Sequence, residues 1–263
     1  MHYSIGQEEL PELLRLALAA ARSASELILS GFRSPRLRVE IKADGSPVTD
    51  FDREAERTIR EFLRLHQPWP VLGEEFGDDS GAARYRWVID PIDGTLGYSR
   101  GLPLFGTLLA FEDVPARCAL IGVIHLPAMS ETYSAARGMG AWCGGERTHV
   151  APSRNLRDCL VAAPPEHQFR LGAVAASHER LRAEVPHVRS YSDCWAHTMV
   201  ARGVIDALAE FNLARWDIAA TEVIVAEAGG RVRIRCARDV PGKYDLLIGS
   251  PGAADAVGAL LDF

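Results

Sequence analysis

The stretch of residues 86–97 constrains this chain more than any other part of it. Here a short apolar run, residues 87–89, ends abruptly in two aspartates, Asp90 and Asp93. Such a run predicts a buried strand whose C-terminal end brings both carboxylates close together. Two neighbouring anions require a cation, so the first expectation is an ion-binding site at the end of this strand.

The residues around the second aspartate predict a sharp turn and the start of a helix. Pro91 stiffens the exit from the strand, Gly94 permits a tight turn, and Thr95 can begin a helix. The first amides of a helix have no partner within it, so they can hold an anion beside a metal bound by the aspartates. Taken alone, the same spacing is also common in a solvent-exposed loop.

Two further acidic clusters favour the metal site over the loop. Glu74 and Glu75 follow a short apolar segment, residues 69–72, and Asp50 and Asp52 lie at the start of a predicted amphipathic helix. Hard divalent cations prefer oxygen ligands, and no histidine or cysteine falls within these clusters. Magnesium therefore fits the clusters better than zinc.

Three motifs together resemble those of the inositol monophosphatase superfamily, whose members are magnesium-dependent phosphomonoesterases. They are residues 73–75 (Gly-Glu-Glu), 87–95 (Trp-Val-Ile-Asp-Pro-Ile-Asp-Gly-Thr) and 216–220 (Trp-Asp-Ile-Ala-Ala). The resemblance covers nearly the whole chain. It implies an α+β fold with a layered α-β-α-β-α sandwich, a homodimer, and a phosphoric monoester hydrolase acting on a small-molecule phosphate monoester.

The resemblance also implies a set of metal ligands. Glu74, Asp90 and the backbone carbonyl of Ile92 would hold one Mg²⁺ ion. Asp90, Asp93 and Asp217 would hold a second, and a third would share Glu74, so two or three ions are expected. A second interpretation of Asp217 stays open, because an acidic residue at the start of a predicted helix is also a common N-cap.

The catalytic roles follow the same superfamily pattern. Thr95 would orient the attacking water, Asp52 would act through Thr95 as its base, and Lys42 would lie near the metals together with Glu74. The backbone amides of Gly94 and Thr95 would bind the phosphate. From the residues alone, Lys42 could equally be a solvated loop lysine, and Asp52 a first-turn acid favoured by the helix dipole.

The pattern of apolar residues divides the chain into two halves. Residues 1–146 are expected to form an α+β half that binds metal and phosphate. Residues 147–263 are expected to form an α/β half that completes the site with Asp217 and the substrate pocket. Elements are predicted at residues 8–32 (helix), 36–42 (strand), from 49 onward (helix), 102–111, 117–125 and 131–136 (strands), 138–145 (hairpin), 158–163, 193–202, 205–211, 217–228, 231–234, 246–248 and 251–261.

Composition excludes several other classes of protein. The net charge is −6 and the isoelectric point about 5.8, so no basic surface for nucleic acid or anionic lipid is expected. No stretch approaches the length of a transmembrane span, and the five scattered cysteines contain no C-x-x-C pair. We expect no nucleic-acid or membrane partner, neither a disulfide framework nor a zinc site, and a cytoplasmic location.

The most detailed expectation concerns the identity of the substrate. Residues 72–77, 101–108 and 191–196 look most like the histidinol-phosphate phosphatase branch of the superfamily, which serves histidine biosynthesis. Its substrate carries an amine and an imidazole, so the pocket needs carboxylates. Asp193 and Glu210 are the candidates for these substrate-binding carboxylates.

Alternatives to this substrate stay open. Leu96 stands where the histidinol branch has a lysine, and residues 215–217 (Arg-Trp-Asp) are closer to the inositol version, so inositol-1-phosphate or a related sugar phosphate is the alternative. Asp193 and Glu210 could each also be solvated at the end of an element. A non-catalytic protein that binds a phosphorylated metabolite on the same fold is a third interpretation, which the complete set of metal ligands disfavours.

Overall fold

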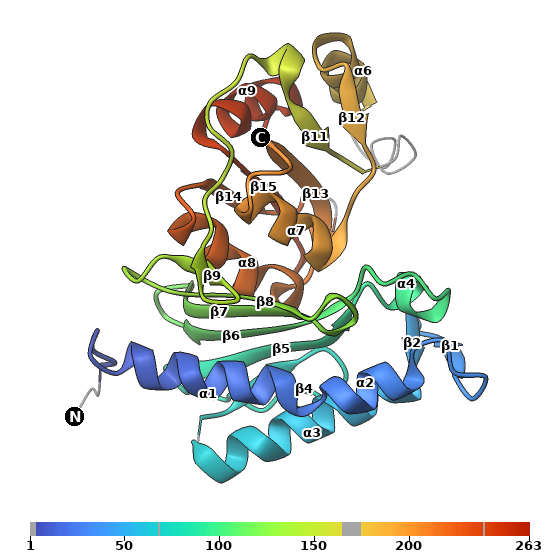
Figure 1. Ribbon diagram of the computed structural model, residues 1–263, viewed down its shortest axis with the longest axis vertical. Helices are drawn as coiled ribbons and strands as arrows, with labels where there is room; N and C mark the ends of the chain where they lie inside the picture. Colours follow the sequence, from blue (N-terminus) through green and yellow to red (C-terminus); the bar gives the residue numbers. More distant parts are fainter. Residues whose placement is uncertain (1–3, 68, 165–174, 239) are drawn as a thin grey trace.

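The structure, a computed structural model, describes residues 4–67, 69–164, 175–238 and 240–263. It confirms the layered α-β-α-β-α sandwich. From bottom to top of Figure 1, the layers are α1 to α3, an eight-stranded sheet, α7 and α8, a five-stranded sheet, and α6 with α9.

The described residues contain helices and strands with the following bounds. The helices are α1 (Leu10–Ser23), α2 (Ser25–Gly31), α3 (Asp50–His66), α4 (Thr95–Ser99), α6 (Ala175–Glu184), α7 (Asp193–Ala201), α8 (Arg215–Glu227) and α9 (Pro251–Leu261), with short 3-10 turns at Pro127–Met129 and Leu156–Asp158. The strands are β1 (Val39–Ile41), β2 (Pro47–Thr49), β3 (Val71–Gly73), β4 (Gly77–Asp78), β5 (Tyr85–Asp93), β6 (Gly106–Asp113), β7 (Cys118–Leu126), β8 (Glu131–Ala136), β9 (Ala141–Cys143), β10 (Glu146–Arg147), β11 (Leu160–Ala162), β12 (His187–Arg189), β13 (Ala207–Leu213), β14 (Arg231–Cys236) and β15 (Tyr244–Gly249).

The order of the strands brings two acidic segments to one edge. Within the described residues the first large sheet has the order β10-β9-β8-β7-β6-β5-β3-β4, and the second β12-β11-β13-β15-β14. β3 and β5 are parallel neighbours, whereas the other strand pairs of the first sheet are antiparallel. Parallel strands have their carboxyl ends at the same edge of a sheet, so β3 delivers Glu74 beside the end of β5 that carries Asp90 and Asp93.

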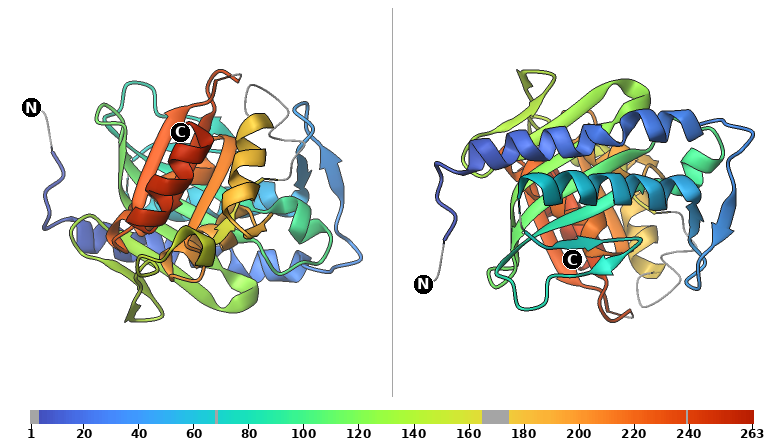
Figure 2. Two further views of the ribbon diagram at one scale, coloured as in Figure 1. Left: turned by 90° about the horizontal axis from the view of Figure 1, so that it is seen from above. Right: turned by 90° about the horizontal axis from the view of Figure 1, so that it is seen from below.

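The long helix predicted over residues 8–32 is wrong in one respect, because it is broken at Ala24 into α1 and α2. The Ser23 hydroxyl donates to a carbonyl one turn earlier (2.7 Å), and the Ser25 hydroxyl lies 2.9 Å from Nε2 of His125. Serine side chains that bond to nearby groups compete with the helix. Figure 2 shows that α1 and α3 nevertheless lie side by side beneath the first sheet.

Several other predictions need correction at their ends. The strand predicted over residues 36–42 is shorter, and β1 pairs with β2 as a separate hairpin. The helix predicted to begin at Asp217 begins two residues earlier, at Arg215. The sequence predicts neither α6 nor β12, because Leu181 is the one large apolar residue of α6 and β12 has only three residues.

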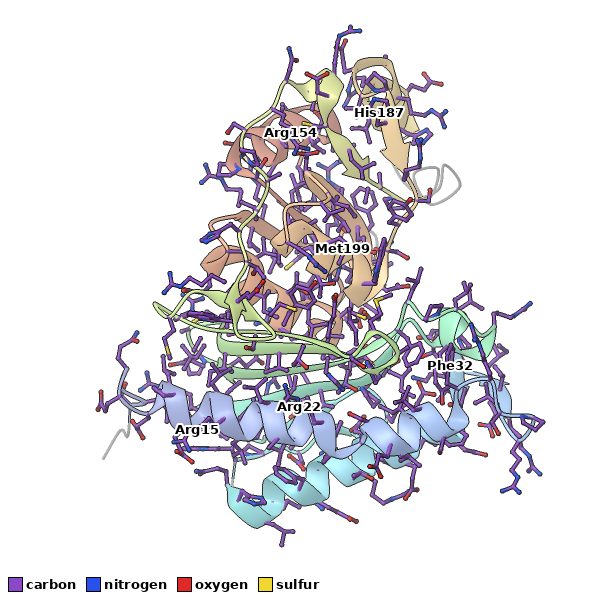
Figure 3. The ribbon with its side chains drawn as sticks, in the orientation of Figure 1. Arg15, Arg22, Phe32, Arg154, His187 and Met199 are labelled. Atoms are coloured by element: carbon purple, nitrogen blue, oxygen red, sulfur yellow. The ribbon has the colours of Figure 1, made fainter. Side chains whose placement is uncertain are left out.

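The two sheets share the helical layer between them. α8 lies directly on the first sheet, since a Cβ at Gly122 of β7 would be 2.3 Å from the Ala220 carbonyl oxygen. Met199 of α7 lies in the same layer (Figure 3) and packs in a core that includes Val88 of the first sheet and Leu246 of the second. One apolar core thus contains residues from both sides of residue 146. The division of the chain into two halves at that residue stays a prediction.

Candidate active site

A cavity of about 300 Å³ opens at the C-terminal end of β5, between the first sheet and the amino ends of α7 and α8. It collects residues that are far apart in the sequence, and most of the predicted site residues line it. Its lining is Ser46, Pro47, Glu74, Asp90, Ile92, Asp93, Gly94, Thr95, Leu96, Ser192, Asp193, His197, Glu210, Leu213 and Asp217.

A bulge in β5 explains how Asp90 and Asp93 reach the same cavity. In a regular strand, residues three apart point to opposite faces. Here Asp90 pairs with Leu108 but Asp93 pairs with Gly106, so β5 has one extra residue between them. Such a bulge turns the next side chain to the other face. The Thr107 hydroxyl donates to the Pro91 carbonyl (2.8 Å), which holds the bulge in place.

Gly94 makes the turn from β5 into α4. Its φ is 83°, and a Cβ would lie 2.8 Å from the Leu104 carbonyl oxygen, so only glycine fits. Thr95 then begins α4 as predicted. Among the residues that the structure describes, neither the Gly94 amide nor the Thr95 amide donates to another segment of the chain. Both donors are therefore available to an anion in the cavity.

Asp52 and Thr95 are in direct contact, although 43 positions separate them. Thr95 Oγ1 lies 2.9 Å from Asp52 Oδ1 and 2.8 Å from the Ile92 carbonyl oxygen. The other Asp52 oxygen accepts hydrogen bonds from the Thr49 amide and hydroxyl, in the capping box that begins α3. Burial raises the pKa of Asp52, although these hydrogen bonds act in the opposite direction. Asp52 thus fills both roles that the sequence leaves open, as a first-turn acid and as the partner of Thr95.

Lys42 is not a solvated loop lysine. Its ammonium lies 2.8 Å from Glu74 and 2.6 Å from Glu75 and ties the β1–β2 hairpin to the site. Burial alone would lower the pKa of Lys42, but the hydrogen bonds to Glu74 and Glu75 outweigh it and raise the pKa. Lys42 is therefore a permanent cation beside the acidic cluster.

A buried ion pair that the sequence analysis misses holds the segment after β3. Glu56 is fully buried, accepts from the Glu75 amide (2.7 Å) and pairs with Arg60 (2.7 Å). Arg60 donates in turn to the Gly77 carbonyl (2.6 Å). Gly73 makes room for this pair, since a Cβ there would be 1.9 Å from Glu56 Oε1. In the sequence, Glu56 and Arg60 look like the exposed charges of α3. The only signal of their pairing is that they are four residues apart.

Replacing Arg60 with methionine is expected to destabilise the protein by about 3 kcal/mol, because the carboxylate of Glu56 then stays buried without its cation. Turnover should fall as well, since the segment that carries Glu74 loses its anchor. Arg15→Met is the matched control, because Arg15 pairs with Glu12 on the exposed face of α1. It should cost no more than about 0.5 kcal/mol. Urea unfolding measures both, and equal losses would contradict the assigned role.

Asp217 is not an N-cap. α8 begins at Arg215 with Ala214 as its N-cap residue, and Asp217, in the third helical position, accepts from the Ala214 amide (2.7 Å). This bond orients the carboxylate at the start of the helix, where it lines the cavity. Burial raises the pKa of Asp217 to about 7, with Glu74 among the other contributors.

The charge of the cavity fits a divalent cation. Burial raises the pKa of Asp90 well above its ordinary value, and the nearby carboxylates Glu74, Asp93 and Asp217 raise it further. Burial also raises the pKa of Asp93, with Asp193 as the next cause. Buried carboxylates whose charges are this poorly compensated favour bound cations. All the donors are oxygens, which suits Mg²⁺.

The side chains of these carboxylates do not converge on a single ion position. In the described parts of the chain, no group of three or more His, Cys, Asp or Glu side chains is arranged to hold an ion by itself. Each acid instead bonds to its own surroundings: Asp90 to the Ile92 amide (3.1 Å), Asp93 to the Cys194 amide (2.5 Å) and Glu74 to Lys42. The ligand set is therefore a proposal, taken up below.

Asp193 and Glu210 also line the cavity, and neither is solvated at the end of an element. Glu210 is buried within β13 and accepts from the Asp193 amide (3.1 Å). Asp193 has a φ of 61°, which is costly for a residue other than glycine. Its Oδ2 would be 3.6 Å from a Cβ at Gly94, so its carboxylate faces the predicted phosphate-binding turn. Burial, followed by the charge of Glu210, raises the pKa of Asp193 to about 6.

A larger cavity, of about 840 Å³, lies away from this site beside α8 and β14. Its cations are largely neutralised: Arg215 bonds to Glu112 (2.7 Å) and Glu222 (3.0 Å), and Arg86 also bonds to Glu112 (2.7 Å). It contains none of the predicted site residues. We therefore place the chemistry in the smaller cavity. Separately, none of the described helices is long and apolar enough to span a membrane.

The family model described as the inositol monophosphatase family matches residues 9–259 of this chain. Histidinol-phosphatases of Chlorobaculum parvum and Mycobacterium tuberculosis are each 37% identical to this chain. The first alignment covers 90% of this chain and 89% of the relative, the second 83% and 86%. An inositol-1-monophosphatase of Mesorhizobium japonicum is 34% identical, with 89% and 88% covered.

Solved structures show the same relationship. The extragenic suppressor protein suhB of Bartonella henselae superimposes with a TM-score of 0.84 at 28% identity, over 95% of this chain and 98% of that one. The family match spans almost the whole sequence, and the relatives named above are phosphatases. The chain belongs to the inositol monophosphatase family and is a phosphoric monoester hydrolase.

Proposed function

We propose that this phosphatase hydrolyses L-histidinol phosphate to L-histidinol and phosphate, with Mg²⁺ as its cofactor. The observation that carries the substrate is the pair Asp193 and Glu210, two carboxylates on the cavity wall outside the proposed metal set. An amine or imidazolium on the leaving group can receive charge-assisted hydrogen bonds from such a pair. The hydroxyls of inositol can form hydrogen bonds with neutral polar groups and do not require a carboxylate partner. The similarity to histidinol-phosphatases supports the same substrate.

The proposed ligands of two or three Mg²⁺ ions are Glu74, Asp90, Asp93, Asp217 and the carbonyl of Ile92. The uncompensated charge of the acids, and their all-oxygen chemistry, support this set. When bound, Mg²⁺ would neutralise charge on the phosphate and make the attacking water more acidic. Asp90 is close enough to Glu74, Asp93 and Asp217 for their charges to raise its pKa, and it is the proposed shared ligand. Lys42 bonds to Glu74 and holds it in the cavity wall.

Thr95 and Asp52 are proposed to handle the proton of the attacking water. The Thr95 hydroxyl has one proton and two acceptors within reach, Asp52 and the Ile92 carbonyl. When Thr95 donates to Asp52, its own oxygen can accept a hydrogen bond from the water, so a proton can pass through Thr95 to Asp52. The burial that raises the pKa of Asp52 makes it a stronger base for this transfer. The amides of Gly94 and Thr95 are proposed to hold the phosphate oxygens.

Inositol-1-phosphate, or a related small sugar phosphate, is the second candidate. Leu96 is 60% exposed and lines the cavity, so the position that carries a lysine in the histidinol branch offers no charge here. The relative from Mesorhizobium japonicum is named an inositol-1-monophosphatase. Kinetics on both substrates separate the two candidates.

The proposal predicts that kcat/KM in Mg²⁺ is higher for histidinol phosphate than for inositol-1-phosphate and glycerol-2-phosphate. Asp193→Asn should lower kcat/KM for histidinol phosphate by roughly 10- to 100-fold, the equivalent of a lost hydrogen bond to a charged group. The effect on glycerol-2-phosphate should be much smaller, because its leaving group is neutral. Phosphate release measures all of these rates.

Two results of that comparison would overturn parts of the proposal. If the unmodified enzyme prefers inositol-1-phosphate, the histidinol assignment is wrong. If Asp193→Asn lowers the rate for every substrate equally, Asp193 has a structural role and not a recognition role. Participation in histidine biosynthesis, a cytoplasmic location and a homodimer stay proposals that follow from the family and from this substrate.

A further inference from the structure

His197, which is also part of the cavity lining, contacts the proposed substrate carboxylate Glu210. Its Nε2 lies 2.6 Å from Glu210 Oε2, and its Nδ1 lies 2.8 Å from the hydroxyl of Thr221. His197 is 1% exposed and Thr221 is completely buried. The three residues come from α7, β13 and α8, so they link the middle helical layer to the wall of the cavity.

The two contacts of the His197 ring favour one of its neutral tautomers. The buried hydroxyl of Thr221 needs an acceptor for its proton, and in the described part of the chain the contact found for it is Nδ1 of His197. If Nδ1 accepts, the ring proton resides on Nε2 and is donated to Glu210. The neutral Nε2–H form therefore satisfies all three groups.

This arrangement fixes how Glu210 faces the cavity. The terminal torsion of a glutamate is broad, so its carboxylate would otherwise rotate freely. Here Oε2 is held by His197 and Oε1 accepts from the Asp193 amide (3.1 Å). Each carboxylate oxygen has two lone pairs, so Oε1 retains acceptor capacity for a ligand in the cavity that it lines.

We propose that His197, supported by Thr221, is a positioning residue that orients Glu210 toward the leaving group and so sets the preference for a cationic alcohol. It acts through Glu210 and needs no contact with the substrate. The inference rests on the proposed function, in which Glu210 binds the leaving group. It adds His197 and Thr221 as the residues that hold the Glu210 carboxylate in one orientation.

The test compares two substitutions at His197 in the Mg²⁺-loaded enzyme. His197→Met removes both nitrogens, and the ratio of kcat/KM for histidinol phosphate over glycerol-2-phosphate should fall roughly 10- to 100-fold, because Glu210 loses its orientation. His197→Gln can place an amide N–H where Nε2–H stands, so this ratio should stay within about threefold. Thr221→Val should lower the ratio in the same direction as His197→Met.

Matched controls separate orientation from general damage to the interior. Thr198 on α7 is also completely buried, but its hydroxyl donates to the Trp195 carbonyl, so Thr198→Val should leave the ratio unchanged. His125 is a buried histidine bonded to Ser25 and Thr132 on the other side of the first sheet, and His125→Met should also leave the ratio unchanged. A fall in the ratio for either control equal to that of His197→Met would overturn the inference.

A double variant keeps the inference distinct from the choice of substrate. In a Glu210→Ala background, His197→Met should cause no further loss on the best substrate of the unmodified enzyme, because the carboxylate that it orients is gone. An undiminished loss there overturns the positioning role. If the unmodified enzyme shows no preference for histidinol phosphate, the proposed function fails, and this double variant still decides the role of His197.

A spectroscopic measurement covers the case in which His197→Met does not fold. Nitrogen-proton correlation NMR of the unmodified protein at neutral pH should show the ring of His197 protonated on Nε2 alone. In Thr221→Val, Nδ1 loses its donor and its resonance should move. A doubly protonated ring, or a proton on Nδ1 alone, would overturn the assigned orientation.

Discussion

Replacing Asp90 with asparagine is expected to lower the rate of phosphate release by about 10³-fold or more. Asp90 is the proposed shared ligand of two Mg²⁺ ions, and an asparagine offers a neutral and weaker donor. A metal that polarises a phosphoryl group contributes several kcal/mol to the transition state, and each 1.36 kcal/mol is a factor of ten in rate. Losing that contribution produces the expected decrease.

The same substitution should leave the metal-free protein folded and no less stable at pH 7. Burial and four neighbouring acids raise the pKa of Asp90 in the folded state, so ionised Asp90 opposes folding at pH values above its unfolded pKa. Asparagine removes that charge and keeps an oxygen that can accept from the Ile92 amide. Mg²⁺ should therefore raise the melting temperature of the unmodified protein but not that of Asp90→Asn.

Asp206→Asn is the matched control, because Asp206 is also fully buried but lies outside the cavity and accepts from the Leu160 amide (2.8 Å). Its turnover should stay within about threefold of the unmodified enzyme, and its melting temperature should rise normally with Mg²⁺. Near-normal turnover of Asp90→Asn would contradict the proposed metal site. So would a loss of the fold in its metal-free form, since relief of charge repulsion could not then be its main effect.

Removing the hydroxyl of Thr95 is expected to lower turnover by about 10²- to 10⁴-fold, the usual range for a positioned proton transfer. Asp52→Asn should resemble Thr95→Ala. An asparagine whose oxygen continues to accept from Thr49 would turn its NH₂ group toward Thr95, so it could no longer accept the proton. Mg²⁺ affinity should change little in either variant, because neither side chain is a proposed ligand.

The double variant tests whether Thr95 and Asp52 act as one unit. If they do, Thr95→Ala combined with Asp52→Asn should be about as slow as the slower single variant. Ser99→Ala on α4 is the control, because the Ser99 hydroxyl is exposed and bonds to the Leu96 carbonyl of its own helix. Losses that multiply in the double variant would show that the two residues act independently.

Much of the fold could be predicted from the sequence because the central strands have clear patterns. β5 and β6 are buried on both faces, so they appear as nearly continuous apolar runs, and α3 begins with a capping box. The family motifs placed Asp90, Asp93, Gly94 and Thr95 around one cavity, and the structure shows how. The bulge in β5 turns two aspartates to the same side, a detail that the spacing of three residues alone does not reveal.

The residues that support the site could not be predicted from local pattern. Glu56 and Arg60 resemble the other charged residues of α3, and their importance comes from a segment about 19 positions away. His197 and Thr221 are 24 positions apart, on α7 and α8, and meet only because both helices lie between the sheets. Beside the break at Ala24, the serine that begins α2 likewise contacts a distant residue, His125.

The central claim is that the carboxylates of this cavity bind Mg²⁺ and that hydrolysis depends on it. The most direct measurement is a calorimetric titration of Mg²⁺ into chelator-treated protein, alongside phosphate release from histidinol phosphate by the same sample. The proposed site predicts no turnover in EDTA, and binding and turnover that rise together over one range of Mg²⁺ concentration. Undiminished turnover in EDTA, or turnover that returns without measurable Mg²⁺ binding, would contradict it.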